Sequence, residues 1–208
     1  MKKTFNYREL LGPENPLLRF PLLYDAAVDE FSQKKFAEAS LNDILRKAEM
    51  SKGSLYHHFG DKFGLYLAVM DRIAVKKLEF FQPLIQKGVD VADFFATILS
   101  IARETMAFMF QDERMYHLTN RLLEEGPEWI SKLLEYFHYD FTSGFGALVD
   151  AAAASGQIDS RYPPELVTKV LEILLTNLHK LTPGKTPEEA VQLLEQTMGI
   201  MQYGLNKR

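Results

Sequence analysis

Residues 40–62 read SLNDILRKAEMSKGSLYHHFGDK, and this stretch decides how the N-terminal part of the chain folds. Ser40 carries a hydroxyl that caps a helix N-terminus, and Asp43 follows three residues later, which predicts a helix through about residue 48. Ser51 is a second N-cap and predicts another short helix over residues 52–58. Only residues 49 and 50 remain between them, so the stretch predicts two short helices joined by a tight turn, a helix-turn-helix.

The second helix of a helix-turn-helix presents its first turns to the major groove of DNA. On these turns the candidate base contacts are Lys52, Ser54 and His57, beside the cap Ser51. Gly53 has no side chain, so the helix end is expected to approach the groove closely. Ser40 and Asn42, at the start of the first helix, are candidates for phosphate contacts through their side chains and free backbone N–H groups. Leu55 and Phe59 are expected to pack inward.

The run SKGSLYHHF over residues 51–59, followed by Lys62 and Leu65, resembles the DNA-binding signature of TetR/AcrR-type bacterial transcriptional regulators. The resemblance spans roughly residues 22–70 and extends more loosely to the C-terminus. It implies that Tyr56 and Lys62 contact DNA phosphates, which position a protein without reading sequence. Glu49 and Lys35 stand where the family usually has glycine. A left-handed non-glycine residue costs roughly 1 kcal/mol, so these two turns are expected to be strained or reshaped.

The composition predicts a packed globular protein, with 47% hydrophobic and 25% charged residues among 208. The absence of cysteine excludes disulfides, thiolate zinc sites and cysteine nucleophiles. No apolar run approaches the roughly 20 residues that span a bilayer, and the N-terminus has no secretory signal, so we expect a cytoplasmic protein without a membrane partner. The net charge is −4. The acidity lies in residues 63–208, so a DNA-binding face depends on where individual lysines stand.

Helical periodicity continues along the chain and predicts an all-α fold. The expected helices cover residues 17–31, 61–81, 91–110, 112–125, 129–154, 163–181 and 186–203, with Pro83 ending the second of these. We expect an N-terminal extension (1–15), a helix-turn-helix DNA-binding domain (16–62) and a ligand-sensing and dimerisation domain (63–208). The extension is either a disordered tail or a basic arm that follows a DNA groove. Gly64 is a candidate hinge where the two domains join.

The two last helices are expected to form the interface of a homodimer, as the resemblance implies. Their apolar stripes are Leu166, Val170, Ile173, Leu174 and Leu178 on one helix, and Val191, Leu194, Met198 and Met201 on the other. The middle helices are rich in aromatic residues and methionine, which predicts a pocket for a small-molecule effector of apolar or aromatic character. Its candidate lining residues are Phe94, Arg103, Met106, Phe110, His117, Arg121, Trp129 and Phe137.

Other classes of function find less support in the sequence. We expect no enzyme, because no nucleophile-base pair, glycine-rich phosphate loop or HExxH motif is present. We expect no cofactor and no metal site, because the adjacent His57 and His58 point about 100° apart on a helix. One alternative is a helical protein-interaction module whose helix-turn-helix does not bind DNA. The resemblance favours a ligand-responsive regulator that binds a palindromic double-stranded DNA operator as a dimer. A repressor is the preferred interpretation, and an activator is the alternative that the sequence leaves open.

Overall fold

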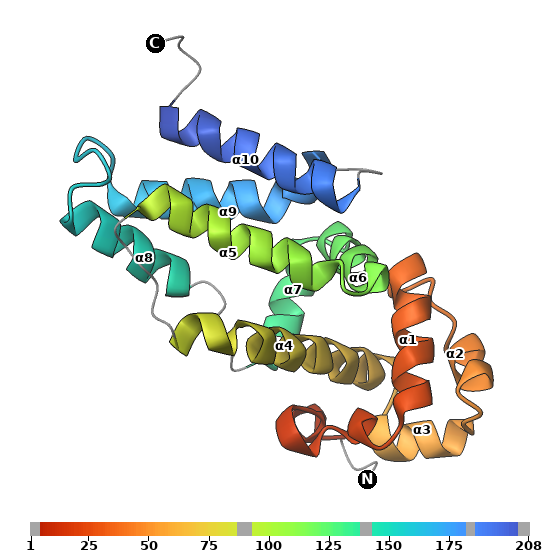
Figure 1. Ribbon diagram of the computed structural model, residues 1–208. Coiled ribbons are helices and arrows are strands. Elements are labelled where there is room, and N and C mark those ends of the chain that lie inside the picture. Colours follow the sequence, from red (N-terminus) through yellow and green to blue (C-terminus); the bar gives the residue numbers. More distant parts are fainter. Residues whose placement is uncertain (1–4, 87–92, 138–142, 182–185, 204–208) are drawn as a thin grey trace. The chain divides into compact units, whose positions relative to one another are not determined.

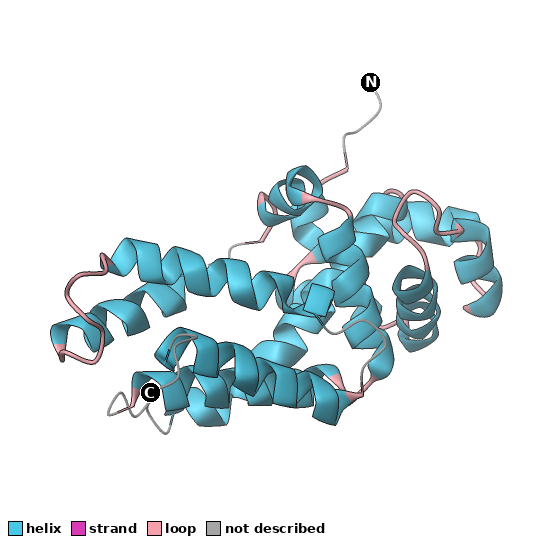
Figure 2. Cartoon of the chain, turned by 90° about the horizontal axis from the view of Figure 1, so that it is seen from above, coloured by secondary structure: helices cyan, strands magenta, loops and turns pink. Residues whose placement is uncertain are grey.

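The computed structural model describes residues 5–86, 93–137, 143–181 and 186–203, which form helices and loops without a strand (Figures 1 and 2). This confirms the all-α prediction. The α-helices are α1 Pro21–Gln33, α2 Leu41–Lys47, α3 Lys52–Phe59, α4 Lys62–Gln86, α5 Phe94–Met109, α6 Glu113–Glu124, α7 Pro127–Leu134, α8 Ser143–Ala154, α9 Pro164–Leu181 and α10 Pro187–Tyr203. In this part of the chain, no helix combines the length and apolarity needed to cross a membrane.

Three expected helix boundaries were wrong. The first is the start of α1, which lies at Pro21 and not at residue 17, because residues 16–18 form a 3-10 turn. Pro83 does not end α4, which continues to Gln86. The single helix expected over residues 129–154 is two helices, because α7 ends at Leu134. Just beyond that end, the Tyr136 ring packs 5.9 Å from the Tyr7 ring and 5.7 Å from the Phe63 ring. The end of α7 thus coincides with a contact to residues that are distant in the sequence.

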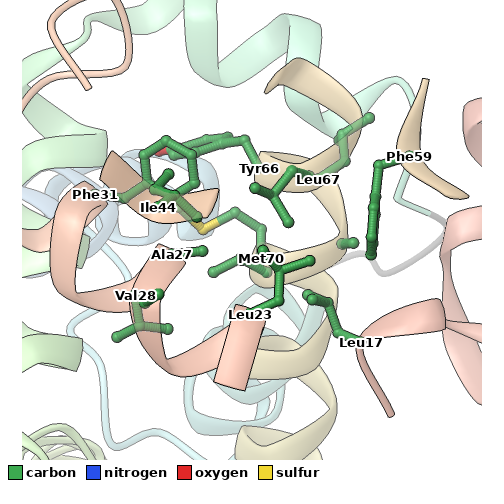
Figure 3. Packing of buried hydrophobic residues seen from close by; sticks show 14 of the residues in the cluster. Leu17, Leu23, Ala27, Val28, Phe31, Ile44, Phe59, Tyr66, Leu67 and Met70 are labelled. Atoms are coloured by element: carbon green, nitrogen blue, oxygen red, sulfur yellow. The ribbon is translucent and has the colours of Figure 1, made fainter. Parts of the chain in front are cut away.

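The chain divides into two compact units, and the first contains Met1–Pro83 and Asp112–His138. It includes the expected DNA-binding domain and also most of α4, with α6 and α7, all of which the sequence placed in the sensing domain. Figure 3 shows the side chains of α1, α2 and α4 converging, with Phe31, Ile44 and Met70 close together. Burying one large apolar side chain contributes about 1.5–3 kcal/mol, so this shared core holds the helix-turn-helix against α4.

The N-terminal segment is neither a disordered tail nor a free arm over its described residues. Residues 5–20 form three short 3-10 turns, at Tyr7–Leu10, Gly12–Glu14 and Pro16–Leu18. Asn15 is 1% exposed, and its Nδ2 donates to the Ala68 carbonyl at 2.8 Å and to Asp71 Oδ2 at 2.9 Å. The Gly12 N–H donates to the same carboxylate oxygen at 3.0 Å. The segment is therefore fastened to the middle of α4. Lys2 and Lys3 lie outside the described residues.

The second unit contains Leu84–Gln111 and Tyr139–Arg208. In it α5 packs against α10 and α8, and α8 packs against α9. Asp93 caps α5 by accepting a hydrogen bond from the Ala96 N–H at 3.0 Å. The fully buried residues at the centre of this unit are Phe94, Ile98, Val149, Leu171 and Leu194. The two units therefore have separate cores.

Candidate nucleic-acid interface

The structure confirms both predicted helix caps of the helix-turn-helix. Ser40 Oγ accepts the Asp43 N–H at 3.2 Å, and Ser51 Oγ accepts the Ser54 N–H at 3.2 Å. These bonds satisfy N–H groups that a helix N-terminus otherwise leaves unpaired. The Met50 N–H donates to the Leu45 carbonyl at 3.0 Å and closes the turn. The predicted helix, turn and helix are thus all present.

One of the two glycine replacements has the expected effect. Glu49 has φ +52° and is the only non-glycine residue with positive φ among those described, so the turn between α2 and α3 carries left-handed strain. Lys35 has no positive φ, because α1 ends through Lys34 in an extended conformation. The strain expected at Lys35 is therefore absent.

The recognition helix α3 exposes the polar residues that the sequence singled out and buries the apolar ones. Ser51, Lys52, Gly53, Tyr56 and His57 are exposed, and Ser54 is half-buried. Leu55 and Phe59 are fully buried, as expected. A Cβ added at Gly53 would meet only Ser51 Oγ, at 3.9 Å, so the helix end is open to close approach. At the first helix, Asn42 is exposed and Ser40 is half-buried.

His58 has a packing role. Its ring lies 4.9 Å from the Phe20 ring and 4.8 Å from the His57 ring. Burial lowers the pKa of His58, and the positive charges near it, from His57 and Arg19, act in the same direction. His58 therefore stays neutral at neutral pH, and of the two histidines His57 is the one on the exposed surface.

Lys62 is placed differently from the expected phosphate ligand. Its Nζ donates to three backbone carbonyls of the loop between α1 and α2, those of Phe36 at 2.6 Å, Ala37 at 3.3 Å and Ala39 at 2.9 Å. Burial lowers the pKa of Lys62, opposed by Glu125 and Glu30. The ammonium is thus engaged within the protein, a role that depends on a loop more than 20 residues away and that the motif does not reveal.

Gly64 is a site of close packing, and this argues against its expected role as a hinge. A Cβ at this position would lie 1.8 Å from the Phe59 carbonyl oxygen and 3.0 Å from Tyr7 Cε1. The Gly64 N–H also donates to Asp61 Oδ1 at 2.9 Å, and Asp61 Oδ2 accepts from the Tyr7 hydroxyl at 2.6 Å. The glycine is required because α3 and α4 meet here with no room for a side chain.

The expected effector residues are divided between the two compact units. Arg103, Met106 and Phe110 line a groove of about 430 Å³ in the second unit, with Ala107, Val191, Gln192 and Glu195. Phe94 lies in the core of that unit at 1% exposure. Four residues belong to the first unit, namely His117, Arg121, Trp129 and Phe137. The groove residues Val191 and Glu195 were not expected there, because nothing in the sequence pairs α10 with α5.

The groove between α5 and α10 has apolar walls and one ion pair. Arg103 Nε donates to Glu195 Oε1 at 3.0 Å, and Arg103 Nη2 also contacts this oxygen. Both side chains remain partly exposed, at 51% and 40%. A pair this accessible to water contributes little to stability, so its charges are available to a ligand.

The apolar stripes of α9 and α10, both expected at the dimer interface, differ in how exposed they are. On α9, Leu166 is 52% exposed, Val170 37% and Ile173 56%, and Leu174 is half-buried. The Leu178 side chain lies outside the described residues. On α10 the expectation was wrong for Leu194 and Met198, which are 0% and 3% exposed because α10 turns this stripe toward α5.

The other two members of the α10 stripe also lie on the inward side. Val191 lines the groove, and Met201 packs against the core of its unit. The exposed apolar residues of α10 are instead Ile200 and Tyr203, at 51% and 57%. The sequence alone did not show which of the apolar sides of α10 faces its own unit.

Comparison with known proteins places the helix-turn-helix in a family. The sequence model described as bacterial regulatory proteins, tetR family, matches residues 23–69. The chain is 26% identical over 189 residues to the HTH-type transcriptional regulator BetI of Burkholderia cenocepacia, covering 77% of this chain and 95% of that protein. It is also 38% identical over 80 residues to the A-factor receptor protein of Streptomyces griseus, which covers 37% of this chain but only 28% of the receptor.

Solved structures show the same fold over most of the chain. A TetR family transcriptional regulator from Chloroflexus aurantiacus has a TM-score of 0.64 at 21% identity, covering 93% of this chain and 95% of that one. The regulator FadR from Bacillus subtilis, solved with stearoyl-CoA, has a TM-score of 0.69 at 13% identity, covering 90% of this chain and all of that one (100%). At these identities the structures establish the fold alone.

Proposed function

Because the chain is a transcriptional regulator of the TetR family, we propose that it represses transcription in the bacterial cytoplasm by binding a palindromic DNA operator as a homodimer, and that an effector relieves repression. The observation that carries the proposal is the exposed face of α3. It combines a cation, hydroxyls and an imidazole on a helix whose opposite side is fully buried. Buried Leu55 and Phe59 fix the helix, while its polar side faces outward.

On this face the residues divide by what they offer to DNA. Lys52, Ser54 and His57 offer donors and acceptors to base edges in the major groove. Tyr56, at 52% exposure, offers its hydroxyl to a phosphate. Asn42 and the capped N-terminus of α2 offer further phosphate contacts.

The proposed dimer rests on the exposed apolar row of α9. Leu166, Val170 and Ile173 recur at helical spacing and are more than a third exposed. Rows of this kind mark interaction surfaces, and Ile200 and Tyr203 add apolar area on α10. A second copy of the chain is the expected cover, because a symmetric operator needs two recognition helices about 34–36 Å apart.

The proposed effector is a small apolar or aromatic molecule that occupies the groove between α5 and α10. The groove is of a size typical for small-molecule sites, and Met106, Phe110 and Val191 provide apolar contact. Arg103 provides a charge, and an anionic group on the effector would compete with Glu195 for it. The FadR structure with stearoyl-CoA supports an apolar ligand for this fold.

Selection from random DNA duplexes tests the proposal. The purified protein is expected to enrich a palindrome, and Lys52→Ala is expected to lose it. Arg161→Ala is the matched control, since it removes an exposed cation outside the helix-turn-helix with the same change of charge. If the wild type enriches no sequence even after unfolding and refolding to remove bound ligand, the DNA-binding proposal fails and a protein-interaction module takes its place.

The effector site has a separate test on the operator complex. Dodecanoate and naphthoate serve as apolar and aromatic anionic probes, and release of the operator is measured by fluorescence anisotropy. Val191→Trp fills the groove and is expected to abolish release while leaving operator affinity unchanged. Release that is undiminished in Val191→Trp would contradict the assignment of the groove.

A further inference from the structure

The loop between α1 and α2 leads directly into the N-cap of α2 and is held at several points. Its last N–H, that of Ser40, donates to Glu30 Oε1 at 2.7 Å. The same carboxylate oxygen accepts from Lys34 Nζ at 2.7 Å, at the beginning of the loop. Glu30 is only 4% exposed although it is ionisable, so these partners replace its lost water. Both ends of the loop are thereby fastened to α1.

The middle of the loop is fastened by Lys62, the first residue of α4. An ammonium group has three donors, and the three carbonyls of residues 36, 37 and 39 accept from it. The ammonium also lies 4.7 Å from the centre of the Phe36 ring. A phosphate would therefore have to compete with loop carbonyls for Lys62.

Phe36 is also held by Glu125, the residue that follows the last turn of α6. Glu125 Oε1 accepts the Phe36 N–H at 2.5 Å. The Phe36 ring packs 4.6 Å from Trp129 of α7 and 5.3 Å from Tyr66 of α4. All these residues belong to the first compact unit. One residue of the loop therefore contacts α4, α6 and α7 together.

We infer that Lys62 and Glu125 are positioning residues that clamp the α1–α2 loop and so hold α2 and α3 in their DNA-binding arrangement, and that Lys62 adds no phosphate contact. The inference rests on the proposed function only for its effect on DNA binding. Its structural part, the clamp, stands without DNA. The resemblance to the family implies instead that this lysine contacts a DNA phosphate, so one experiment can decide between the two roles.

Salt dependence separates a clamp from a phosphate contact. The slope of log affinity against log salt changes by about 0.9 for each phosphate contact, hence by about 2 when a contact is removed from both subunits of a dimer. Lys62→Met keeps the aliphatic stem and removes the donors. The clamp predicts an affinity about tenfold lower with an unchanged slope, since a hydrogen bond to a charged group contributes on that scale. For comparison, the salt dependence of operator affinity is also measured for Lys52→Ala, which removes a lysine from the DNA-facing surface.

Amide hydrogen exchange tests the clamp without DNA, so that a failure of the proposed function leaves this test intact. Residues 36–44 are expected to exchange faster in Lys62→Met and in Glu125→Ala than in the wild type. Glu125→Gln keeps an acceptor oxygen and is expected to preserve protection, and Lys52→Ala is expected to leave it unchanged. The inference is overturned if Lys62→Met flattens the salt slope by about 2, or if exchange in this loop is unaffected by Lys62→Met and Glu125→Ala.

Discussion

Replacing Gly64 with alanine adds one methyl group at the tightest point between α3 and α4. The new Cβ would lie 1.8 Å from the Phe59 carbonyl oxygen. That oxygen belongs to the backbone and accepts the Asp61 N–H at 2.9 Å, so it cannot move aside by rotating a side chain. The backbone of the turn must shift instead, and the N-cap bond from the Gly64 N–H to Asp61 is disturbed with it.

Two opposing contributions set the size of the effect. Alanine favours the helical backbone over glycine by about 1 kcal/mol. Forcing a methyl group into a filled site costs typically 1–3 kcal/mol, and the upper end applies here because the contacting atom is backbone. We therefore expect Gly64→Ala to lower the free energy of unfolding by about 2 kcal/mol. For a chain of this length that corresponds to a melting temperature lower by roughly 4–8 °C.

Urea denaturation followed by circular dichroism measures this change, with Gly199→Ala as the matched control. Gly199 lies inside α10, and a Cβ there would meet nothing within 4 Å. That variant is expected to gain up to about 1 kcal/mol from helix propensity alone. If Gly64→Ala proves as stable as the wild type, the packing argument is wrong and a hinge at this position becomes tenable again.

Three further changes follow from single features of the structure. Glu49→Gly removes a non-glycine residue from a left-handed conformation, which relieves about 1 kcal/mol of strain. Part of this gain is offset because glycine gives the unfolded chain more conformational freedom. We therefore expect the free energy of unfolding, measured in urea, to rise by about 0.5 kcal/mol. Burial raises the pKa of Asp71, so its contribution to stability is full below the unfolded pKa near 4 and is lost as pH rises through the folded pKa. Asp71→Asn should therefore gain stability relative to the wild type as pH rises above 4, and a difference that stays constant with pH would refute this. Ile173→Asp places a charge in the proposed α9 interface and should convert dimer to monomer in sedimentation, whereas Arg161→Ala, outside α9, should not.

The features that the sequence predicted correctly have local causes. The caps at Ser40 and Ser51 bond to N–H groups three residues along the chain, and the burial of Leu55 and Phe59 follows from spacing within one helix. Such contacts are visible in a short window of sequence. The helix-turn-helix and the exposed side of its second helix were therefore predictable residue by residue.

The features that the sequence missed depend on contacts between distant residues. Asn15 and Asp71 are 56 positions apart, and the only sequence signal is an acidic residue at the end of an apolar run over residues 65–70. The stripe of α10 could not be assigned, because periodicity shows that a helix has an apolar side but not whether its own unit or a second copy covers it. Only the packing of α10 on α5 decides that Leu194 and Met198 face inward.

Lys52 and Lys62 show why a motif does not fix the role of a residue. Both are lysines of the same signature, ten positions apart, and the first is exposed while the second meets three carbonyls. Those carbonyls lie between α1 and α2, outside either helix, and a carbonyl that is shielded from water on folding needs another donor. Lys35 begins this loop with a turn in which its carbonyl accepts the Glu38 and Ala39 N–H groups, at 3.0 and 2.9 Å. The turn leaves the carbonyls of residues 36, 37 and 39 to accept from Lys62, so the role we infer for this lysine depends on a loop that lies outside the signature.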